Sequence, residues 1–548
     1  MSLSGRIRTP VITALITGVG ALFATGCGLL GTASPAAASS NLQSMFEDPA
    51  LALPNADVTD TLQTLRYLGV GILRVPVVWS TVAANPDSQT EPTGNPYTNW
   101  AMYDNIVNTA QRFGIAVDLM PTSGAPLWAT KSGTPPCSTL AGNPICFQGT
   151  FMPSARLYQQ FVQAVATRYR SVHFWEVWNE ANWGPSLTPQ YLHSSVPVSA
   201  NIYRGLLDAG YSALRGAGHG HDTILFGSLS QDGSAPTVGE THTTAPLIFV
   251  RTLFCLNNNY RQLTGAGARQ AGCPTSKLGF RHFRGAHPAL FSVSGLGLHP
   301  YPAAGKPPNQ LDYPNANGAE FAEIPQVIRS LDRVEKAYGS GKRLSIYNTE
   351  YSFATRPNLT SASIATPTQA AAFINQAEYM SWKNPRVATY DQYELVDQGW
   401  FPVGLLFPQN TQACPGVVTC PKPSFFSYRL PVWLPVTSTK RGKSLEVWGD
   451  VRPARYARVD TGQPQSVQIQ YAPNGSNTYQ TVKSVRITNT QGYFDVHVKF
   501  PGSGNVRLAW TYPSGDGALT DPIATLAGEP ATLLDPQAFS RVTSITLH

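Results

Sequence analysis

Apolar and polar residues follow two patterns along the chain, and the first extends from residue 41 to about residue 435. Here short apolar runs, rich in β-branched and aromatic residues, alternate with segments whose apolar residues recur at helical spacing. The runs expected to be strands buried on both faces of a parallel sheet are 42–46, 72–78, 115–120, 173–178, 223–227, 293–298, 344–350 and 386–393. Eight strand–helix units close a (β/α)8 barrel, so this region is predicted to be an α/β domain with the TIM-barrel fold.

The second pattern begins at about residue 442 and is typical of an antiparallel sheet. Apolar and polar residues alternate over 466–471, 482–488, 493–500 and 506–512, and Asn-Gly and Pro-Gly pairs separate these runs as turns. This predicts a C-terminal antiparallel β-sandwich of the immunoglobulin or fibronectin type. The expected organisation is therefore a signal peptide over 1–38, a barrel domain over 39–438 and a sandwich over 439–548.

The first residues have the features of an export signal. Arg6 and Arg8 precede an apolar run over 11–30, and three alanines at 36–38 offer a cleavage site. This predicts a secreted protein. The segment ending at Cys27 faintly resembles a lipoprotein cleavage box, so a lipid anchor at Cys27 is the alternative. No later stretch is long and apolar enough to predict a transmembrane segment.

The other six cysteines fall along the chain as neighbours. An even number of cysteines in an exported chain suggests disulfides, and pairing between neighbours needs only short loop closures. The expected disulfides are Cys137–Cys146, Cys255–Cys273 and Cys414–Cys420. Free buried thiols are the alternative interpretation.

Composition narrows the class of partner. Of 548 residues only 13% are charged, and the net charge of +7 is not concentrated in any run of Lys or Arg. Such a composition favours a loop-rich secreted protein over a nucleic-acid binder. The sequence contains no His, Cys and Asp cluster at ligand spacing, so neither a metal nor another cofactor is expected. The oligomeric state stays open.

Two glutamates stand out because each follows a predicted strand. The apolar run from residue 173 ends in polar residues that include Glu180, and the run from residue 344 ends at Glu350. A buried barrel strand that carries polar groups at its C-terminal end is the usual location of a TIM-barrel active site. Two carboxyl groups at one rim are what glycoside hydrolysis requires.

These two segments resemble motifs of a known group of enzymes. Residues 178–182, Trp-Asn-Glu-Ala-Asn, resemble the Trp-Asn-Glu-Pro-Asn motif after the fourth strand of clan A glycoside hydrolases, particularly family 39. Residues 349–351, Thr-Glu-Tyr, resemble the segment that carries their nucleophile after strand seven. The resemblance covers residues 41–435, with Ala181 in place of the proline. It implies a retaining mechanism, with Glu180 as acid/base and Glu350 as nucleophile.

Further residues are expected around this pair. Asn179 is expected to hydrogen-bond the sugar 2-hydroxyl. Arg74 lies inside an apolar strand, where an unpaired charge is costly, so we expect it to pair with Glu350. The resemblance also places an Arg near the nucleophile, and a His or Tyr that hydrogen-bonds it after strand six. His299 and Tyr301 match that place, and Tyr301 would lower the pKa of Glu350. Core packing at a Pro-rich bend is the alternative for these two.

Three tryptophans follow predicted strands and are candidates for stacking against sugar rings. They are Trp128, Trp183 and Trp400. Trp400 is favoured, because related enzymes place an aromatic platform after strand eight, and Trp79 is a weaker candidate. Buried packing is the alternative for each ring.

The sequence therefore predicts a secreted retaining glycoside hydrolase that acts on poly- or oligosaccharides through a glycosyl-enzyme. A transglycosylase would use the same two carboxyl groups and is one alternative. A non-catalytic carbohydrate-binding barrel is the other, although it would be expected to lack one of the two glutamates. The sugar, the linkage, and exo or endo action depend on loops that the sequence does not determine.

Overall fold

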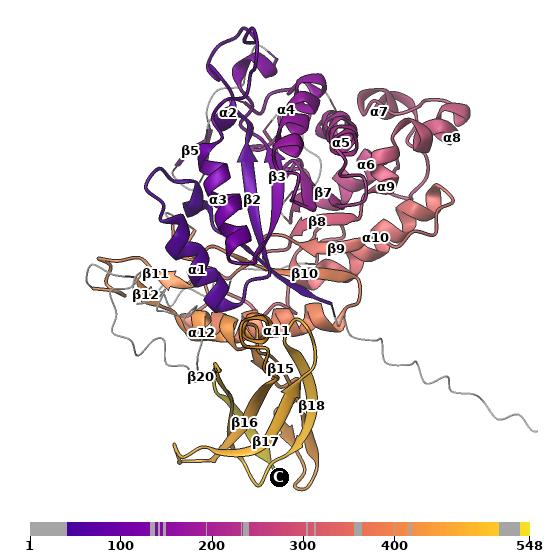
Figure 1. The fold of residues 1–548 in the computed structure, drawn as a ribbon. Coiled ribbons are helices and arrows are strands. Elements are labelled where there is room, and N and C mark those ends of the chain that lie inside the picture. Colours follow the sequence, from indigo (N-terminus) through magenta and orange to yellow (C-terminus); the bar gives the residue numbers. More distant parts are fainter. Residues whose placement is uncertain are drawn as a thin grey trace, which may run out of the picture. The chain divides into compact units, whose positions relative to one another are not determined.

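The barrel expected from the sequence is present in the computed structural model, which describes residues 41–131, 138–140, 143–145, 149–192, 194–231, 233, 241–302, 305–311, 314–355, 364–398, 401–415, 419–513 and 537–548. Eight parallel strands close in the order β1-β10-β9-β8-β7-β6-β3-β2 (Figure 1). Their bounds are β1 (Gln43–Glu47), β2 (Ile72–Val78), β3 (Ala116–Thr122), β6 (Phe174–Val177), β7 (Thr223–Ser230), β8 (Gly295–His299), β9 (Ser345–Asn348) and β10 (Val387–Tyr393). Each overlaps one predicted strand, so the TIM-barrel prediction is confirmed.

Helices on the outside of the barrel connect successive strands (Figure 1). The main ones are α1 (Val58–Leu68), α3 (Ala101–Arg112), α4 (Ala155–Arg168), α5 (Ser199–Gly216), α6 (Pro246–Leu253), α10 (Ile324–Ala337), α11 (Pro367–Lys383) and α12 (Pro423–Arg429). The shorter elements are η1 (Pro49–Ala52), α2 (Trp79–Val82), η2 (Leu127–Ala129), η3 (Phe321–Glu323) and the strand pairs β4 (Ser138–Leu140) with β5 (Asn143–Ile145) and β11 (Leu406–Phe407) with β12 (Cys420–Pro421). Within the described part of the chain, no helix has the length and apolar character needed to cross a bilayer.

Helix α1 shows how the sequence determines one such element. Its buried face consists of apolar residues at helical spacing, which are Val58, Leu62, Leu65 and Leu68. The helix begins where the Asp57 carboxylate accepts a hydrogen bond from the Asp60 backbone N–H at 3.0 Å. It ends at Gly69, whose φ of 85° is readily adopted only by glycine. A Cβ here would lie 2.4 Å from the Arg452 backbone carbon, so glycine also allows close approach of the C-terminal part of the chain.

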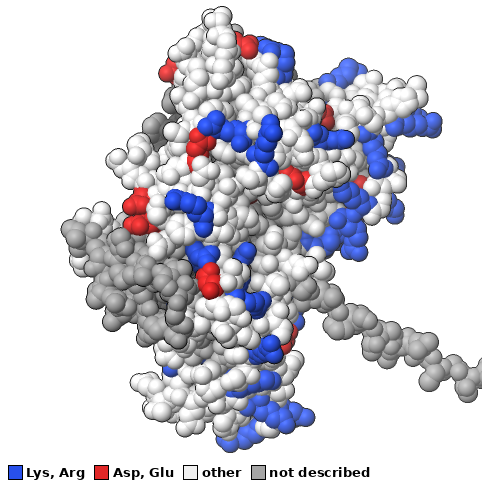
Figure 2. Space-filling view, viewed as in Figure 1, with Lys and Arg blue, Asp and Glu red and all other residues white. Residues whose placement is uncertain are grey.

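Between α6 and β8 the chain forms three short helices that the sequence pattern did not predict. They are α7 (Gly265–Gln270), α8 (Lys277–Ala286) and α9 (Pro288–Ser292). Figure 2 shows Lys and Arg side chains gathered on the side of the molecule where Figure 1 places α8 and α10. The segment of α7–α9 is thus an insertion on the flank of the barrel.

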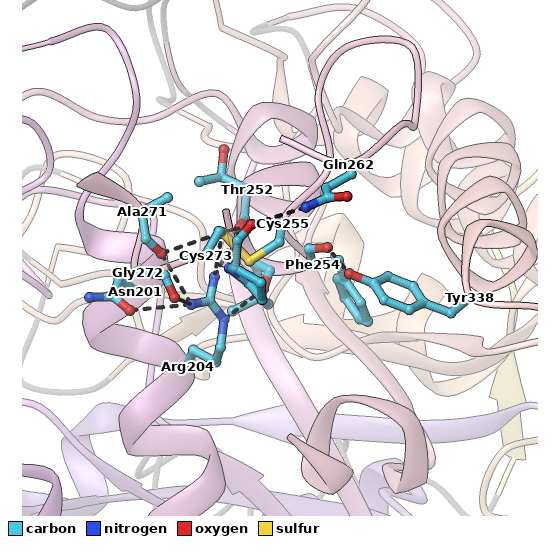
Figure 3. Close-up of a disulfide and its surroundings, with 12 residues drawn as sticks. Asn201, Arg204, Thr252, Phe254, Cys255, Gln262, Ala271, Gly272, Cys273 and Tyr338 are labelled. Carbon is cyan, nitrogen blue, oxygen red and sulfur yellow. Dashed lines mark hydrogen bonds between the residues drawn. A yellow bond between two sulfur atoms is a disulfide. The ribbon is translucent and has the colours of Figure 1, made fainter. Parts of the chain in front are cut away.

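A disulfide and a buried arginine attach this insertion to α5 (Figure 3). Cys255 and Cys273 are bonded, as predicted, and Arg204 lies beside them with 1% of its surface exposed. The Arg204 guanidinium donates hydrogen bonds to the carbonyl oxygens of Thr252 at 3.0 Å and Ala271 at 3.1 Å. Because burial is not offset by a carboxylate in contact, the pKa of Arg204 falls to about 10.

The other predicted disulfides have different outcomes. Cys414 and Cys420 are bonded, which confirms the second pair. The Cys137–Cys146 pair lies outside the described residues, and it stays a prediction.

The C-terminal part of the chain forms two sheets that are largely antiparallel, as expected. One sheet has the order β13 (Val432–Trp433), β15 (Ser444–Asp450), β18 (Tyr493–Lys499). The other has the order β14 (Ser438–Thr439), β21 (Thr543–Leu547), β19 (Gly504–Thr511), β16 (Gln465–Pro473), β17 (Gln480–Ile487), and β20 (Gln537–Phe539) pairs with β19. A shared apolar core includes Val447, Val467, Ile469, Leu508 and Trp510. Helix α13 (Ala454–Thr461) was not predicted, and the immunoglobulin-like or fibronectin-like topology stays a prediction.

A buried ion pair joins these sheets to the barrel helices. Arg452 Nη2 donates to Glu378 Oε2 of α11 at 2.7 Å, and Arg452 Nε donates to the Tyr428 carbonyl oxygen of α12 at 2.8 Å. The hydroxyl of Tyr493 in β18 donates to the other Glu378 oxygen at 2.9 Å. Arg452 and Glu378 are each 1% exposed, so each charge depends on its partner for stabilisation.

Arg452→Ala is therefore expected to lower the free energy of unfolding by about 3–5 kcal/mol, because Glu378 would stay buried without its cation. The double variant Arg452→Met with Glu378→Leu should recover most of that loss, because both charges are removed. Urea denaturation measures the effect, with Lys440→Ala at an exposed turn as the control. A loss below about 1 kcal/mol for Arg452→Ala, equal to that of the control, would contradict the role of this ion pair.

Candidate active site

The candidate active site is built around Arg74, which is 1% exposed in the middle of β2. Its Nε donates to Glu176 Oε1 at 2.9 Å, and its Nη2 donates to Asn179 Oδ1 at 3.0 Å. Its Nη1 donates to Glu350 Oε1 at 3.3 Å and also contacts a carboxylate oxygen of Glu47. The guanidinium thus connects residues from four barrel strands or the loops that follow them. The expected Arg74–Glu350 pair is present.

Glu180 and Glu350 lie close together although 170 positions separate them in the sequence. Glu180 follows β6 and Glu350 follows β9, so both stand at the C-terminal ends of barrel strands. One oxygen of Glu180, one oxygen of Glu350 and one ring nitrogen of His299 all lie within 4.8 Å of one another. The side chains are 11% and 14% exposed, so both carboxyl groups are largely buried but accessible to solvent.

The backbone after β6 turns sharply to present Glu180. Trp178 has a φ of 71° and Glu180 a φ of 43°, both in the left-handed region that residues with a Cβ rarely adopt. Asn182 holds the turn, because its Oδ1 accepts from the Ser230 N–H at 3.0 Å and its Nδ2 donates to the Thr244 carbonyl oxygen at 2.9 Å. Backbone strain of this kind is common where a reactive side chain must be held in one position.

His299, at the end of β8, contacts both glutamates. Its Nδ1 lies 2.8 Å from Glu180 Oε1 and 3.2 Å from Glu350 Oε2. Burial lowers the pKa of His299 to about 4, although the charge of Glu350 acts in the opposite direction. At neutral pH the ring is therefore uncharged, and the Nδ1–H tautomer donates to the two carboxyl groups. Its Nε2 has no hydrogen-bond partner among the residues that the structure describes.

Tyr301 donates its hydroxyl hydrogen to Glu350 Oε2 at 3.2 Å. Burial raises the pKa of Glu350, while the charge of Arg74 and the hydrogen bond from Tyr301 act to lower it. The sequence analysis anticipated the effect of Tyr301 but not that burial would outweigh it. The net effect is a raised pKa of Glu350, which Arg74 and Tyr301 limit.

Three buried carboxyl groups near Arg74 were missed by the sequence analysis. They are Glu47 in β1, Asp118 in β3 and Glu176 in β6. Burial raises the pKa of Glu176, but the Arg74 guanidinium and hydrogen bonds such as that from Ser228 outweigh it and lower the pKa. Burial raises the pKa of Glu47 to about 8 and that of Asp118 well above its usual range. Arg74 therefore favours the ionised form of Glu176, whereas burial favours the protonated forms of Glu47 and Asp118.

A signal for two of these residues was present in the sequence. Asp118 and Glu176 interrupt predicted apolar strands in the same way as Arg74 does. The argument that a charge in a buried strand needs a partner applies equally to all three residues. Glu47 immediately follows a predicted strand and gives a weaker signal.

The tryptophans proposed to line the site differ in position. Trp128 is 7% exposed, packs edge-on against Trp79 at 6.3 Å, and donates its Nε1–H to the Ala84 carbonyl oxygen at 3.3 Å. Trp128 and Trp79 are thus core residues, as the alternative interpretation held. Trp183 is partly exposed, and its backbone N–H donates to the Glu180 carbonyl oxygen at 2.7 Å. Its backbone therefore lies beside the site. Trp400 lies outside the described residues.

The fold brings together two groups of residues that have the ligand types of a metal site. Glu180, His299 and Glu350 form one group. Here Arg74 already supplies a positive charge 3.3 Å from Glu350, which disfavours a further divalent cation. The second group consists of His173, which precedes β6, and His219 and Asp222, which precede β7. Asp222 accepts hydrogen bonds from His173 at 2.9 Å and from His219 at 2.6 Å. Sequence spacing revealed neither group, because each combines residues from distant parts of the sequence.

Neither a protein-family model nor a curated protein sequence matches this chain. Similar solved structures include a family 39 glycoside hydrolase from the gut symbiont Bacteroides cellulosilyticus WH2, 14% identical, covering 85% of this chain and 80% of that chain, with a TM-score of 0.45. A family 1 β-glucosidase from Thermotoga maritima is 14% identical, covering 67% of this chain and 84% of that chain, with a TM-score of 0.42. The family 39 resemblance expected from the sequence is thus found among solved structures.

Tyr301→Phe is expected to raise the pKa of Glu350, because the variant loses a donor that stabilises the ionised carboxylate. Carbon-13 NMR titration of protein labelled at the glutamate carboxyl carbons measures this pKa, with Glu350→Gln identifying the signal. Tyr347→Phe, which removes a hydroxyl elsewhere in β9, is the matched control. An unchanged or lower Glu350 pKa in Tyr301→Phe would contradict the assigned hydrogen bond.

Proposed function

We propose that this protein is a retaining glycoside hydrolase that cleaves O-glycosidic bonds of poly- or oligosaccharides. The observation that supports this most is the approach of Glu180 and Glu350, with one oxygen of each within 4.8 Å of the other. Retaining enzymes have carboxyl groups about 5–5.5 Å apart, while inverting enzymes need about 6.5–9.5 Å to admit a water molecule between them. The separation fits direct attack on the sugar by one of the two carboxylates.

In the proposed first step, Glu180 donates its proton to the glycosidic oxygen while Glu350 attacks the anomeric carbon. The glycosidic bond breaks and a glycosyl ester forms on Glu350. In the second step Glu180 removes a proton from water, which attacks the anomeric carbon and releases the ester. The contacts of Glu350 with Arg74 and Tyr301 favour its ionised form, as a nucleophile requires.

Asn179 is proposed to orient the substrate. Its Oδ1 accepts a hydrogen bond from Arg74 at 3.0 Å, which leaves the amide N–H groups as donors. A donor beside the nucleophile suits the sugar 2-hydroxyl, where a hydrogen bond can strengthen in the transition state. Trp183 is proposed to provide an apolar surface for a sugar ring.

We propose that the protein is exported after removal of residues 1–38, and the two disulfides are compatible with an oxidising compartment. The barrel domain is proposed to extend to about residue 438. The C-terminal sheets are proposed to form a sandwich that braces the barrel, because the buried Arg452–Glu378 pair joins them.

Glu350→Gln is expected to lower kcat by roughly 10⁴-fold, because no glycosyl ester can form. A panel of aryl β-glycosides identifies the sugar, and its 2-deoxy-2-fluoro analogue with a good leaving group then traps the ester. Intact-mass and peptide analysis should find one sugar adduct on Glu350 of the unmodified enzyme and none in the variant. An adduct on another residue would refute the assignment.

Glu180→Gln is expected to lower kcat by roughly 10²–10⁴-fold on alkyl glycosides. The loss should be much smaller on dinitrophenyl glycosides, because their leaving group departs without a proton. Steady-state kinetics on the two substrate types measure the difference, with Glu91→Gln at an exposed carboxylate as the control. Equal losses on both types would exclude Glu180 as the general acid.

A further inference from the structure

The flank of the barrel between β7 and β8 is strongly basic. Residues 241–302 contain no Asp or Glu, and they include five Arg and one Lys. Three of these cations, Lys277, Arg281 and Arg284, lie in α8 and are exposed. Their spacing of four and three residues places them along one side of the helix, about 5–6 Å apart.

Helix α10 extends this surface. It exposes Arg329, Arg333 and Lys336. The two helices are adjacent, because Tyr338, just after α10, stacks on Phe280 of α8 with ring centres 4.8 Å apart. We call the six cations of α8 and α10 the basic face, and Figure 2 shows this concentration of Lys and Arg.

Nearby carboxylates do not neutralise the basic face. Among the residues that the structure describes, none of its six cations forms a salt bridge. On α10, Asp332 pairs with Arg386 at 3.0 Å, and Glu335 is buried with 1% of its surface exposed; burial raises the pKa of Glu335, although the charges of Lys342 and Arg284 act to lower it. Lys277 is the first residue of α8, where the positive end of the helix dipole is unfavourable for a cation. The arrangement is therefore repulsive by itself, and a bound polyanion would relieve the repulsion.

The basic face is also rigid. The Cys255–Cys273 disulfide and the hydrogen bonds of Arg204 fix the chain before α8 (Figure 3). Phe283 is 1% exposed and stacks on Tyr338 at 5.5 Å, which fixes the helix itself. Because the helix that carries these cations is fixed, the spacing of the cations along the face is set before binding, which favours recognition of a repeating ligand.

We propose that the basic face binds an anionic polysaccharide, with carboxylate or sulfate groups that pair with the Arg and Lys side chains. The choice of a polysaccharide over other polyanions rests on the proposed glycosidase function. The aromatic rings of α8 stack inward on Tyr338, so they are not available to stack on nucleic-acid bases. The basic face would hold a polymer on the barrel flank while the proposed catalytic carboxyl groups act on glycosidic bonds.

Isothermal titration of the full chain with polygalacturonate tests the proposal. Binding should weaken about tenfold or more between roughly 50 and 200 mM NaCl, because polyanion binding releases counterions. The triple variant K277Q/R281Q/R284Q should weaken it at least about tenfold at low salt. A second variant, R329Q/R333Q/K336Q, should also weaken binding and covers the case in which the first does not fold.

The matched control is K440Q/R441Q/K443Q, which removes the same charge from an exposed turn between β14 and β15. It should weaken binding less than about threefold. Equal losses in the control and the α8 variant would show a net-charge effect and overturn the proposal, as would no binding by the unmodified chain. Tighter binding of duplex RNA than of polygalacturonate would assign the basic face to nucleic acid instead. If the unmodified chain binds polygalacturonate but has no glycosidase activity, the proposed function is refuted and the polyanion site is retained.

Discussion

The site and the barrel depend on one buried charge, the Arg74 guanidinium in β2. It contacts Glu176 at 2.9 Å, Asn179 at 3.0 Å and Glu350 at 3.3 Å, and these residues come from two other strands and the loops that follow them. A buried guanidinium is tolerated only when its donors find acceptors, so the barrel strands must stay in register for the fold to be stable. The same requirement places the proposed nucleophile beside a fixed cation.

The surrounding carboxyl groups outnumber the cations, and because burial raises the pKa of all of them, their contacts with Arg74 and with hydrogen-bond donors determine which ionised forms are favoured. Glu176 is ionised against Arg74, while burial raises the pKa of Glu47 to about 8. Opposing effects act on the pKa of Glu350, because burial raises it while Arg74 and Tyr301 act to lower it. A poorly solvated carboxyl group whose contacts favour its ionised form suits a nucleophile, and a neutral His299 between Glu350 and Glu180 adds no competing charge.

Local patterns predicted much of this structure. Period and composition were sufficient for the eight barrel strands, and the end of a buried strand identified both Glu180 and Glu350. They did not show which rings face the site, because Trp128 occupies a core position that depends on its packing with Trp79. The contact of His299 with both glutamates was also missed, since the resemblance suggested contact with the nucleophile alone.

The basic face is another feature that depends on packing between distant segments and that local sequence patterns did not predict. Three of its cations lie in a stretch without Asp or Glu, residues 241–302, and the other three lie between Arg329 and Lys336, so no single stretch contains all six. The packing of Tyr338 on Phe280 brings the two helices together and concentrates the charge. The two clusters of metal-ligand types likewise combine residues from distant parts of the sequence, which sequence spacing does not reveal.

The central claim is that Glu180 and Glu350 act on one anomeric carbon by double displacement. Its most direct test is proton NMR of the sugar released in the first minutes of hydrolysis, before mutarotation equilibrates the anomers. The account predicts that the first-formed product has the same anomeric configuration as the substrate. A product of inverted configuration would contradict it, because single displacement requires a water molecule between carboxyl groups that stand further apart than these.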